Sequence, residues 1–82
     1  MYTKEKTMEI CEKFYEDCYA HWLRDFATNK VLQSERDETI TVEEQAKAYA
    51  IRDIKAITRN PFSPSGDDLN VEGKEAFLST LA

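Results

Sequence analysis

Glycine and proline are scarce in this 82-residue chain, which contains two of each. None occurs before Pro61, and all four lie between Pro61 and Gly73. This distribution excludes collagen-like and long low-complexity tracts, and it leaves the first 60 residues without a helix breaker. We therefore expect a single small domain, residues 1–82, with a helical body and a turn-rich segment over residues 60–70.

Long hydrophobic runs are also absent, since no apolar run exceeds four residues. A membrane-spanning helix needs about 20 apolar residues, and the core of a signal peptide needs at least about 7. The sequence therefore predicts a cytoplasmic protein with no membrane partner.

Leu, Ile, Val and Phe are few, 17 in all. They make up about a fifth of the chain, close to the level of roughly 20% below which disorder becomes common. A core of this size is marginal for so short a chain. We therefore expect a homo-oligomer, in which self-association completes the core.

Positive charge is outnumbered, with 11 Lys and Arg against 16 Asp and Glu, so the net charge is −5. No block of basic residues provides the footprint of a nucleic-acid-binding surface, and the acidic balance repels phosphates. We therefore expect a protein partner rather than a nucleic acid.

Only two cysteines occur, Cys11 and Cys18. Seven positions apart in one helix, they are separated by about 10 Å along its axis, beyond the roughly 7 Å limit for a disulfide. We expect reduced thiols that pack as small hydrophobes. Cys18 and His21 could approach one metal ion with Asp17 or Asp25, but no second ligand pair completes a structural zinc site. The sequence predicts neither a metal nor another cofactor.

Catalytic patterns are missing as well. The single histidine has no framework for a nucleophilic triad, and no glycine-rich phosphate loop occurs. The acidic residues fall mostly on polar helix faces, where carboxylates serve solvation. We therefore expect that the protein is not an enzyme.

Apolar residues at helical spacing predict a long amphipathic helix over about residues 3–32. Its apolar stripe is wide enough to face one neighbour along its middle and a second along its flank. Asn29 offers a shorter alternative, because a left-handed C-cap there would end the helix at Thr28.

Aromatic residues crowd this helix, which contains five of the nine in the chain. A small core does not easily bury all of them, and aromatic residues are common anchors of interfaces. The interaction residues expected from this helix are Tyr15, Tyr19, Trp22 and Phe26.

The polar side of the same helix carries an acidic stripe, Glu5, Glu9, Glu12 and Glu16. A row of carboxylates can imitate a phosphate backbone toward a DNA-binding enzyme. Three lysines interleave with the stripe and dilute its field, which favours a solvated face instead.

A capping box, Thr41 followed by Glu44, predicts a second helix over about residues 42–59. Pro61 pushes Asn60 out of helical geometry and sets the latest possible end. Alanines on the apolar face allow a partner helix to approach closely. The alternating β-branched residues over 39–42 leave a short strand open as an alternative.

Asp53 is the one carboxylate that falls on the apolar face of the second helix. A buried, unpaired charge is costly, so we expect a partner such as His21, a lysine, an arginine or a tyrosine hydroxyl. The alternative is a contact across an oligomer or with a ligand, which makes Asp53 the fifth expected interaction residue.

The turn segment over 60–70 has Phe62 as its expected anchor and leads into a short helix over about residues 70–81. Asp67, Asp68 or Asn70 can cap this helix. Gly73 weakens it by up to about 1 kcal/mol relative to alanine, so it needs tertiary contacts. The expected fold is all-α, with two main helices and a short C-terminal one.

These observations predict a small acidic regulator or inhibitor that acts by protein–protein binding. In general character the chain resembles the small accessory and host-takeover proteins of bacteriophages and mobile elements, although no motif matches a particular family. The alternative is a helical oligomer that binds a small ligand or nucleotide in a pocket between subunits.

Overall fold

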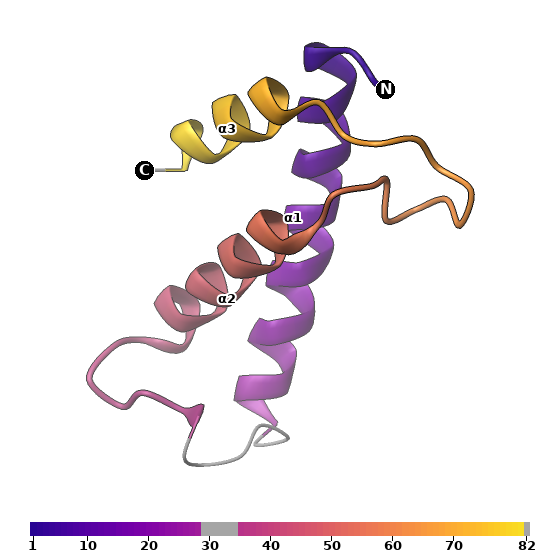
Figure 1. The fold of residues 1–82 in the computed structure, drawn as a ribbon. Helices are drawn as coiled ribbons and strands as arrows, with labels where there is room; N and C mark the ends of the chain where they lie inside the picture. The colour runs from indigo at the N-terminus through magenta and orange to yellow at the C-terminus, as the bar shows by residue number, and fades with distance from the viewer. Residues whose placement is uncertain (29–34, 82) are drawn as a thin grey trace.

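The computed structural model describes residues 1–28 and 35–81, which form three helices. They are α1 (Lys4–Ala27), α2 (Val42–Ala56) and α3 (Val71–Thr80), and together they hold more than half of the chain. The expected all-α fold of two main helices and a short third one is confirmed. Figure 1 shows α3 beside the N-terminal half of α1 and α2 nearer its C-terminal half.

Helix α1 is the element on which the other two pack. Its 24 residues span about 36 Å, close to the longest dimension of the molecule, 39 Å. The hydroxyl of Thr3 caps its start by accepting from the Lys6 amide at 3.1 Å. The apolar stripe therefore faces two neighbours, but they follow one another along the helix and do not divide its middle and flank as expected (Figure 1).

Helix α1 ends at Ala27, five residues before the expected end at residue 32 and one residue before the end of the shorter alternative. The left-handed cap of that alternative falls at Asn29, which lies outside the described residues. Thr28 closes the last turn, because both its amide, at 3.0 Å, and its hydroxyl, at 2.9 Å, donate to the Arg24 carbonyl. Residues 29–32 of the longer prediction lie outside the described part of the chain.

Helix α2 begins as the capping box predicts. Thr41 Oγ1 accepts from the Glu44 amide at 3.0 Å, and the Thr41 hydroxyl donates to the Glu44 carboxylate at 3.2 Å. The second arm of the box therefore ends on the hydroxyl and not on the backbone amide of Thr41. Residues 39–42 form a turn and the helix start, so the strand alternative is wrong.

The end of α2 comes at Ala56, three residues before the expected end at residue 59. Ile57 is already extended, with φ −77° and ψ 141°. The Lys74 ammonium of α3 donates hydrogen bonds to the carbonyls of Lys55, at 3.1 Å, and Ile57, at 2.7 Å. These carbonyls are satisfied by a distant residue, so the helix has no need of a further turn.

The connection from α2 to α3 folds back on itself through one antiparallel bridge, Arg59 with Asp68. Phe62 anchors it, as expected, by an edge-to-face contact with Phe14 at 6.0 Å between ring centroids. Phe62 is not the only anchor, because Leu69 is just 5% exposed. The loop is thus fixed from two sides.

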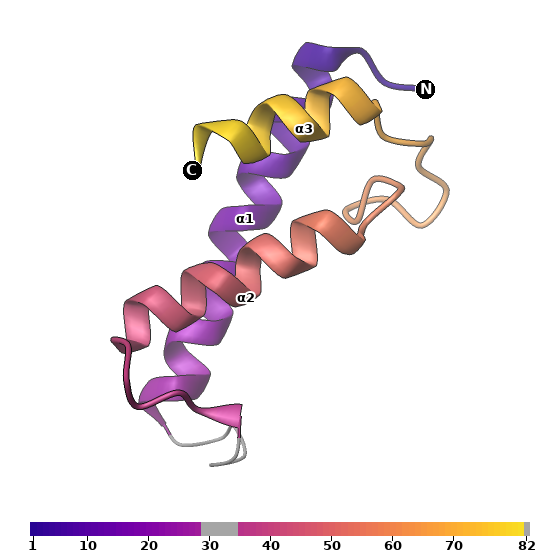
Figure 2. The same ribbon diagram turned by 60° about the vertical axis from the view of Figure 1, so that its left-hand side comes forward.

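Figures 1 and 2 show α3 beside the first turns of α1. Gly73 lies at this contact. A Cβ at this position would lie 2.7 Å from the Lys4 carbonyl oxygen and 2.9 Å from Thr7 Cβ. Thr7 is fully buried and its hydroxyl accepts from the amide of Asn70, whose own side chain caps α3 through the Gly73 amide. The expected need of α3 for tertiary contacts is met here.

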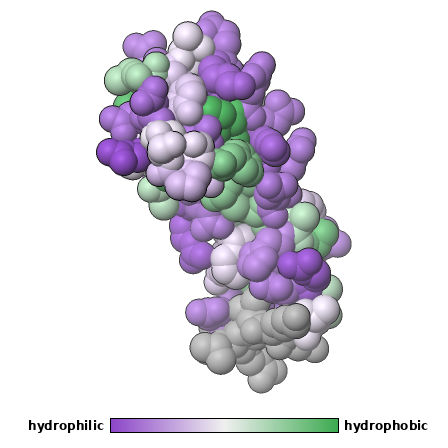
Figure 3. Space-filling model, turned by 90° about the vertical axis from the view of Figure 1, so that its right-hand side faces the viewer, coloured by the Kyte–Doolittle hydropathy of each residue, from purple (hydrophilic) through white to green (hydrophobic). Residues whose placement is uncertain are grey.

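The centre of the core is small and draws on all three helices, through Cys11, Ile54 and Phe77. On the face shown in Figure 3, hydrophilic residues predominate and hydrophobic residues reach the surface in limited areas. None of the helices in the described part of the chain is long and apolar enough to cross a bilayer.

Candidate functional site

The five expected interaction residues separate into two places in the structure. Trp22 and Phe26 pack with Tyr49 of α2, with ring centroids 4.9 and 5.3 Å from the Tyr49 ring. Phe26 is only 5% exposed. These two residues therefore join α1 to α2 within the chain.

Asp53 belongs to the same joint. Its carboxylate accepts a 2.8 Å hydrogen bond from the Trp22 indole N–H, in a half-buried position. A paired Asp53 was expected, but its hydrogen-bond partner is neutral and is not among the partners proposed from the sequence. The reason is geometric, since His21 lies on the exposed side of α1 and pairs with Asp25 at 3.2 Å.

Two arginines cover this joint from outside. The Arg52 guanidinium lies 4.2 Å from the centroid of Tyr49 and 5.7 Å from that of Trp22. Arg36 lies 6.0 Å from the centroid of Phe26. The aromatic faces at this end of the molecule are thus occupied by cations of the same chain.

The other two expected residues, Tyr15 and Tyr19, stack on each other at 6.2 Å and lie farther toward the N-terminus of α1. Tyr15 also contacts Phe77 of α3 edge-on at 6.0 Å. Burial and the neighbouring Tyr19 raise the pKa of the Tyr15 hydroxyl. Tyr15 is therefore partly enclosed at the line where α1 meets α3.

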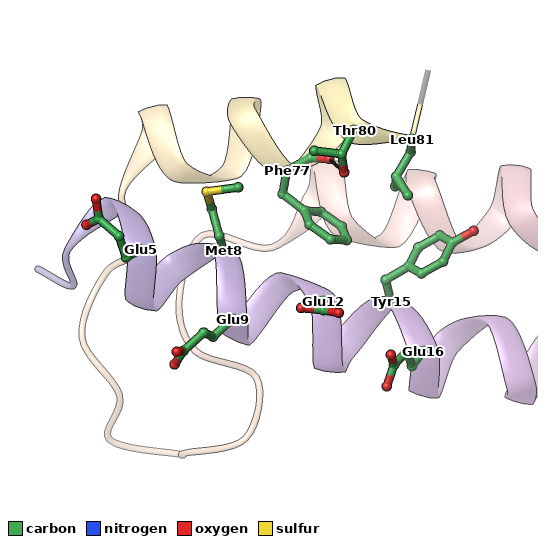
Figure 4. Close-up of a pocket in the computed structure, with 9 residues that line it drawn as sticks. All are labelled: Glu5, Met8, Glu9, Glu12, Tyr15, Glu16, Phe77, Thr80 and Leu81. Carbon is green, nitrogen blue, oxygen red and sulfur yellow. Dashed lines mark hydrogen bonds between the residues drawn. The ribbon is translucent and has the colours of Figure 1, made fainter.

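A groove of about 530 Å³ opens along this line, and we refer to it as the α1/α3 groove. Four side chains form its apolar floor, Met8, Tyr15, Phe77 and Leu81. Figure 4 shows Met8 of α1 and Phe77 of α3 pointing into the space between the two helices, and Tyr15 beside Leu81. Thr80 lines the groove on the side of α3.

The acidic stripe of α1 borders the groove, and we call it the acidic edge: Glu5, Glu9, Glu12 and Glu16. All four side chains are exposed, and in Figure 4 Glu9 and Glu16 project from the side of α1 away from α3. Within the described residues only Glu9 has an ion-pair partner, Lys6 at 3.5 Å. Lys13 is drawn to the Phe62 ring, 4.7 Å from its centroid. Glu5, Glu12 and Glu16 therefore form no ion pair with a lysine within the described residues.

The groove continues toward the start of α2 through a second hollow of about 450 Å³. The two hollows share Tyr15, Thr80 and Leu81. The second one adds Tyr19, two more acidic residues, Glu43 and Glu44, and the cation Lys47. Apolar floor and acidic border thus extend together over all three helices.

The thiols are poorly suited to nucleophilic chemistry. Burial is the main cause that raises the pKa of Cys11, and burial together with the charge and hydrogen bonding of Asp53 raises the pKa of Cys18 to about 11. Both cysteines are free, as expected, and both are buried. Residues 1–28 and 35–81 contain no group of three or more side chains placed to hold a metal ion.

Sequence reasoning assigned no interaction role to Met8, Phe77 or Leu81. It interpreted the acidic edge as a solvated face. The sequence does contain one sign that apolar and acidic residues share a site. Positions 8, 12 and 15 are neighbours at helical spacing, so Met8 and Tyr15 lie next to the glutamates on the helix surface. The identity of the opposite wall depends on tertiary packing.

Comparisons of the chain with protein-family models, with curated proteins and with solved structures found no match. The function considered next is therefore inferred from the residues and geometry of this chain alone.

Proposed function

We propose that the protein is a small regulator or inhibitor that acts by binding another protein, and that the α1/α3 groove is its binding surface. The groove supports this proposal because it combines an open apolar floor with a charged border. Three residues of the floor, Met8, Tyr15 and Leu81, are half-buried, and Phe77 is 7% exposed. Partly exposed apolar side chains bordered by polar residues are typical of protein interaction sites. A role as a phage or mobile-element accessory protein is one form this regulation can take.

The expected aromatic anchors contribute unequally to this proposal. Tyr15 and Tyr19 line the two hollows, whereas Trp22 and Phe26 are engaged with Tyr49 and the arginines of the same chain. Two of the four expected aromatic residues therefore line the proposed binding surface. Met8, Phe77 and Leu81 line it as well.

The rival function, binding of a small ligand or nucleotide, fits the volume of the groove but not its charge. Cavities of about 300–1,000 Å³ suit small molecules, and the groove measures about 530 Å³. A nucleotide, however, would bring its phosphates next to four carboxylates, of which only Glu9 has an ion-pair partner within the described residues. The acidic edge favours a partner without a dense negative charge.

Site-specific photocrosslinking tests the proposal. A photoreactive amino acid is placed at Thr80, which lines the groove, and as a matched control at Ala48, an exposed helical position that lines neither hollow. We expect one defined protein to be joined at Thr80 in a 1:1 adduct, and not at Ala48. That protein should change its activity or assembly when the wild-type chain is added.

A Leu81→Lys variant supplies the second control, because it places a charge on the floor of the groove without touching the α1–α2 joint. It should abolish the Thr80 adduct while the helix content measured by circular dichroism is retained. Equal adduct yields from Thr80 and Ala48 would contradict the proposal.

A further inference from the structure

The glutamates of the acidic edge are spaced at the repeat of an α-helix and extend over about three turns. They are four, three and four residues apart, which keeps them on one line along α1. From Glu5 to Glu16 the line is about 17 Å long. The groove beside it is therefore an elongated surface, matched to a rod-like partner segment.

The groove walls decide between a helical and an extended partner. The amides and carbonyls of α1 and α3 are used within the helices, and the described residues contain no strand ladder with a free edge, only the single bridge of Arg59 and Asp68. An extended segment would find no backbone partners there, whereas a helix satisfies its own backbone groups and needs only side-chain contacts.

The charge of the border decides the chemistry of the partner. Of the four glutamates only Glu9 has an ion-pair partner within the described residues, and the neighbouring hollow adds Glu43 and Glu44. Opposite charge steers a partner to such a surface and sets its register. A second copy of this chain would bring a further net charge of −5 to the same place.

We infer that the α1/α3 groove binds a basic amphipathic helix of another protein, about three turns long, and this inference rests on the function proposed above. The apolar side chains of the partner helix contact Met8, Tyr15, Phe77 and Leu81. Its lysines or arginines lie at helical spacing along one flank, where they meet the acidic edge.

Defined peptides test this chemistry directly. A fluorescent peptide of roughly 14 residues, or about four turns, carries leucines on one face and lysines along one flank. A matched peptide has glutamates in place of the lysines. Fluorescence anisotropy with the full-length protein should show binding of the basic peptide at least tenfold tighter than that of the acidic one, and the difference should shrink at high salt.

Charge-neutralising variants locate the binding. The triple change Glu5→Gln, Glu12→Gln and Glu16→Gln should weaken basic-peptide binding by roughly 1.4- to 5-fold per glutamate removed. The control removes the same charge from exposed positions outside the groove, Glu38→Gln, Glu72→Gln and Glu75→Gln. This control variant should bind the basic peptide more weakly than wild type only by the small amount that its smaller net negative charge causes. When the basic peptide is added to the wild-type protein, the chemical-shift changes should map to the groove.

Each contrary result has a distinct meaning. Equal affinity for the two peptides, or equal loss in both triple variants, overturns the inference, while a partner still joined at Thr80 leaves the proposed function standing. Thr80 adducts that join two copies of this chain would identify a second copy as the occupant and also overturn the inference. If no adduct specific to the groove forms, the proposed function itself is contradicted.

Discussion

Gly73 sits at a close approach of α3 to α1, which gives a sharp test at the scale of one residue. A Gly73→Ala change would gain up to about 1 kcal/mol in helix propensity if the site were open. Here the new Cβ would lie 2.7 Å from a backbone carbonyl, that of Lys4, which has little room to move. We therefore expect a net loss of about 1–3 kcal/mol in unfolding free energy.

Urea denaturation measures this loss, and Glu75→Ala, an exposed change in the same helix, is the control that should stay within about 0.5 kcal/mol. A Gly73→Ala variant more stable than wild type would show that the two helices can separate without cost.

The hydrogen bond between Asp53 and Trp22 makes a second prediction. If Asp53 formed a buried ion pair, Asp53→Ala would lower the unfolding free energy by about 3–5 kcal/mol. The partner is instead a neutral indole, and the site is half-buried. We therefore expect a loss of about 1–3 kcal/mol. Asp53→Asn keeps an acceptor and should lose less.

The readout is again the unfolding free energy, supported by the fluorescence of the single tryptophan, whose environment changes when the bond is removed. The exposed Asp17→Ala on α1 is the matched control. If Asp53→Ala and Asp17→Ala behave alike, the hydrogen bond contributes nothing measurable.

Cys18 predicts a pH dependence. Burial and Asp53 raise the pKa of its thiol from 9.0 to about 11. The unfolded chain releases this proton near pH 9, whereas the folded chain retains it. The contribution of the thiol to stability is therefore complete below pH 9 and is lost as the pH rises toward 11.

Comparison with Cys18→Ala isolates this contribution from the titration of lysines and tyrosines. The stability advantage of wild type over the variant should shrink between pH 9 and 11 in thermal or urea denaturation. An advantage that stays constant over this range would mean that the thiol titrates in the fold as it does in the unfolded chain.

At the scale of an element, the start of α2 depends on the side chain of Thr41. Thr41→Ala removes the acceptor for the Glu44 amide and should lower the unfolding free energy by about 0.5–2 kcal/mol. Thr41→Ser retains the hydroxyl and should restore most of the loss. An unchanged denaturation midpoint in Thr41→Ala would place the functional start of the helix elsewhere.

Helix starts could be predicted better than helix ends, and the reason is physical. The caps at Thr41 and Asn70 act within three residues, so the sequence contains the whole interaction. The end of α2 depends on Lys74, which lies 17 residues beyond the Ile57 carbonyl it binds. A contact between distant residues of this kind cannot be deduced from local spacing.

For the whole molecule, the same distinction applies to the candidate site. The amphipathic stripe of α1 correctly indicated two neighbours, but it could not show which aromatic residues each neighbour would cover. Phe77 of α3 and Leu81, the residue that follows this helix, complete the groove from a part of the chain more than 60 residues away from Met8. The acidic edge borders a groove only when this wall has packed against α1.

Self-association stays a prediction. The small number of Leu, Ile, Val and Phe residues still favours it. The long helix, however, fits within the 39 Å length of the molecule, and Trp22 and Phe26 pack inside the chain. Sedimentation measured over a hundredfold concentration range around micromolar should reveal a dimer or larger species. A single 9.5 kDa species throughout would contradict the prediction.

The docking of α3 on the first turns of α1 also has a consequence for the order of folding. The joint of Trp22 and Asp53 closes 31 residues, whereas the bond between Thr7 and Asn70 closes 63, so the hairpin of α1 and α2 has the shorter loop to close. In a partly opened molecule that has released α3, most of the helical structure persists, yet one wall of the groove is gone. Hydrogen exchange should therefore be faster in α3 than in α2, and an occupant of the groove should slow it.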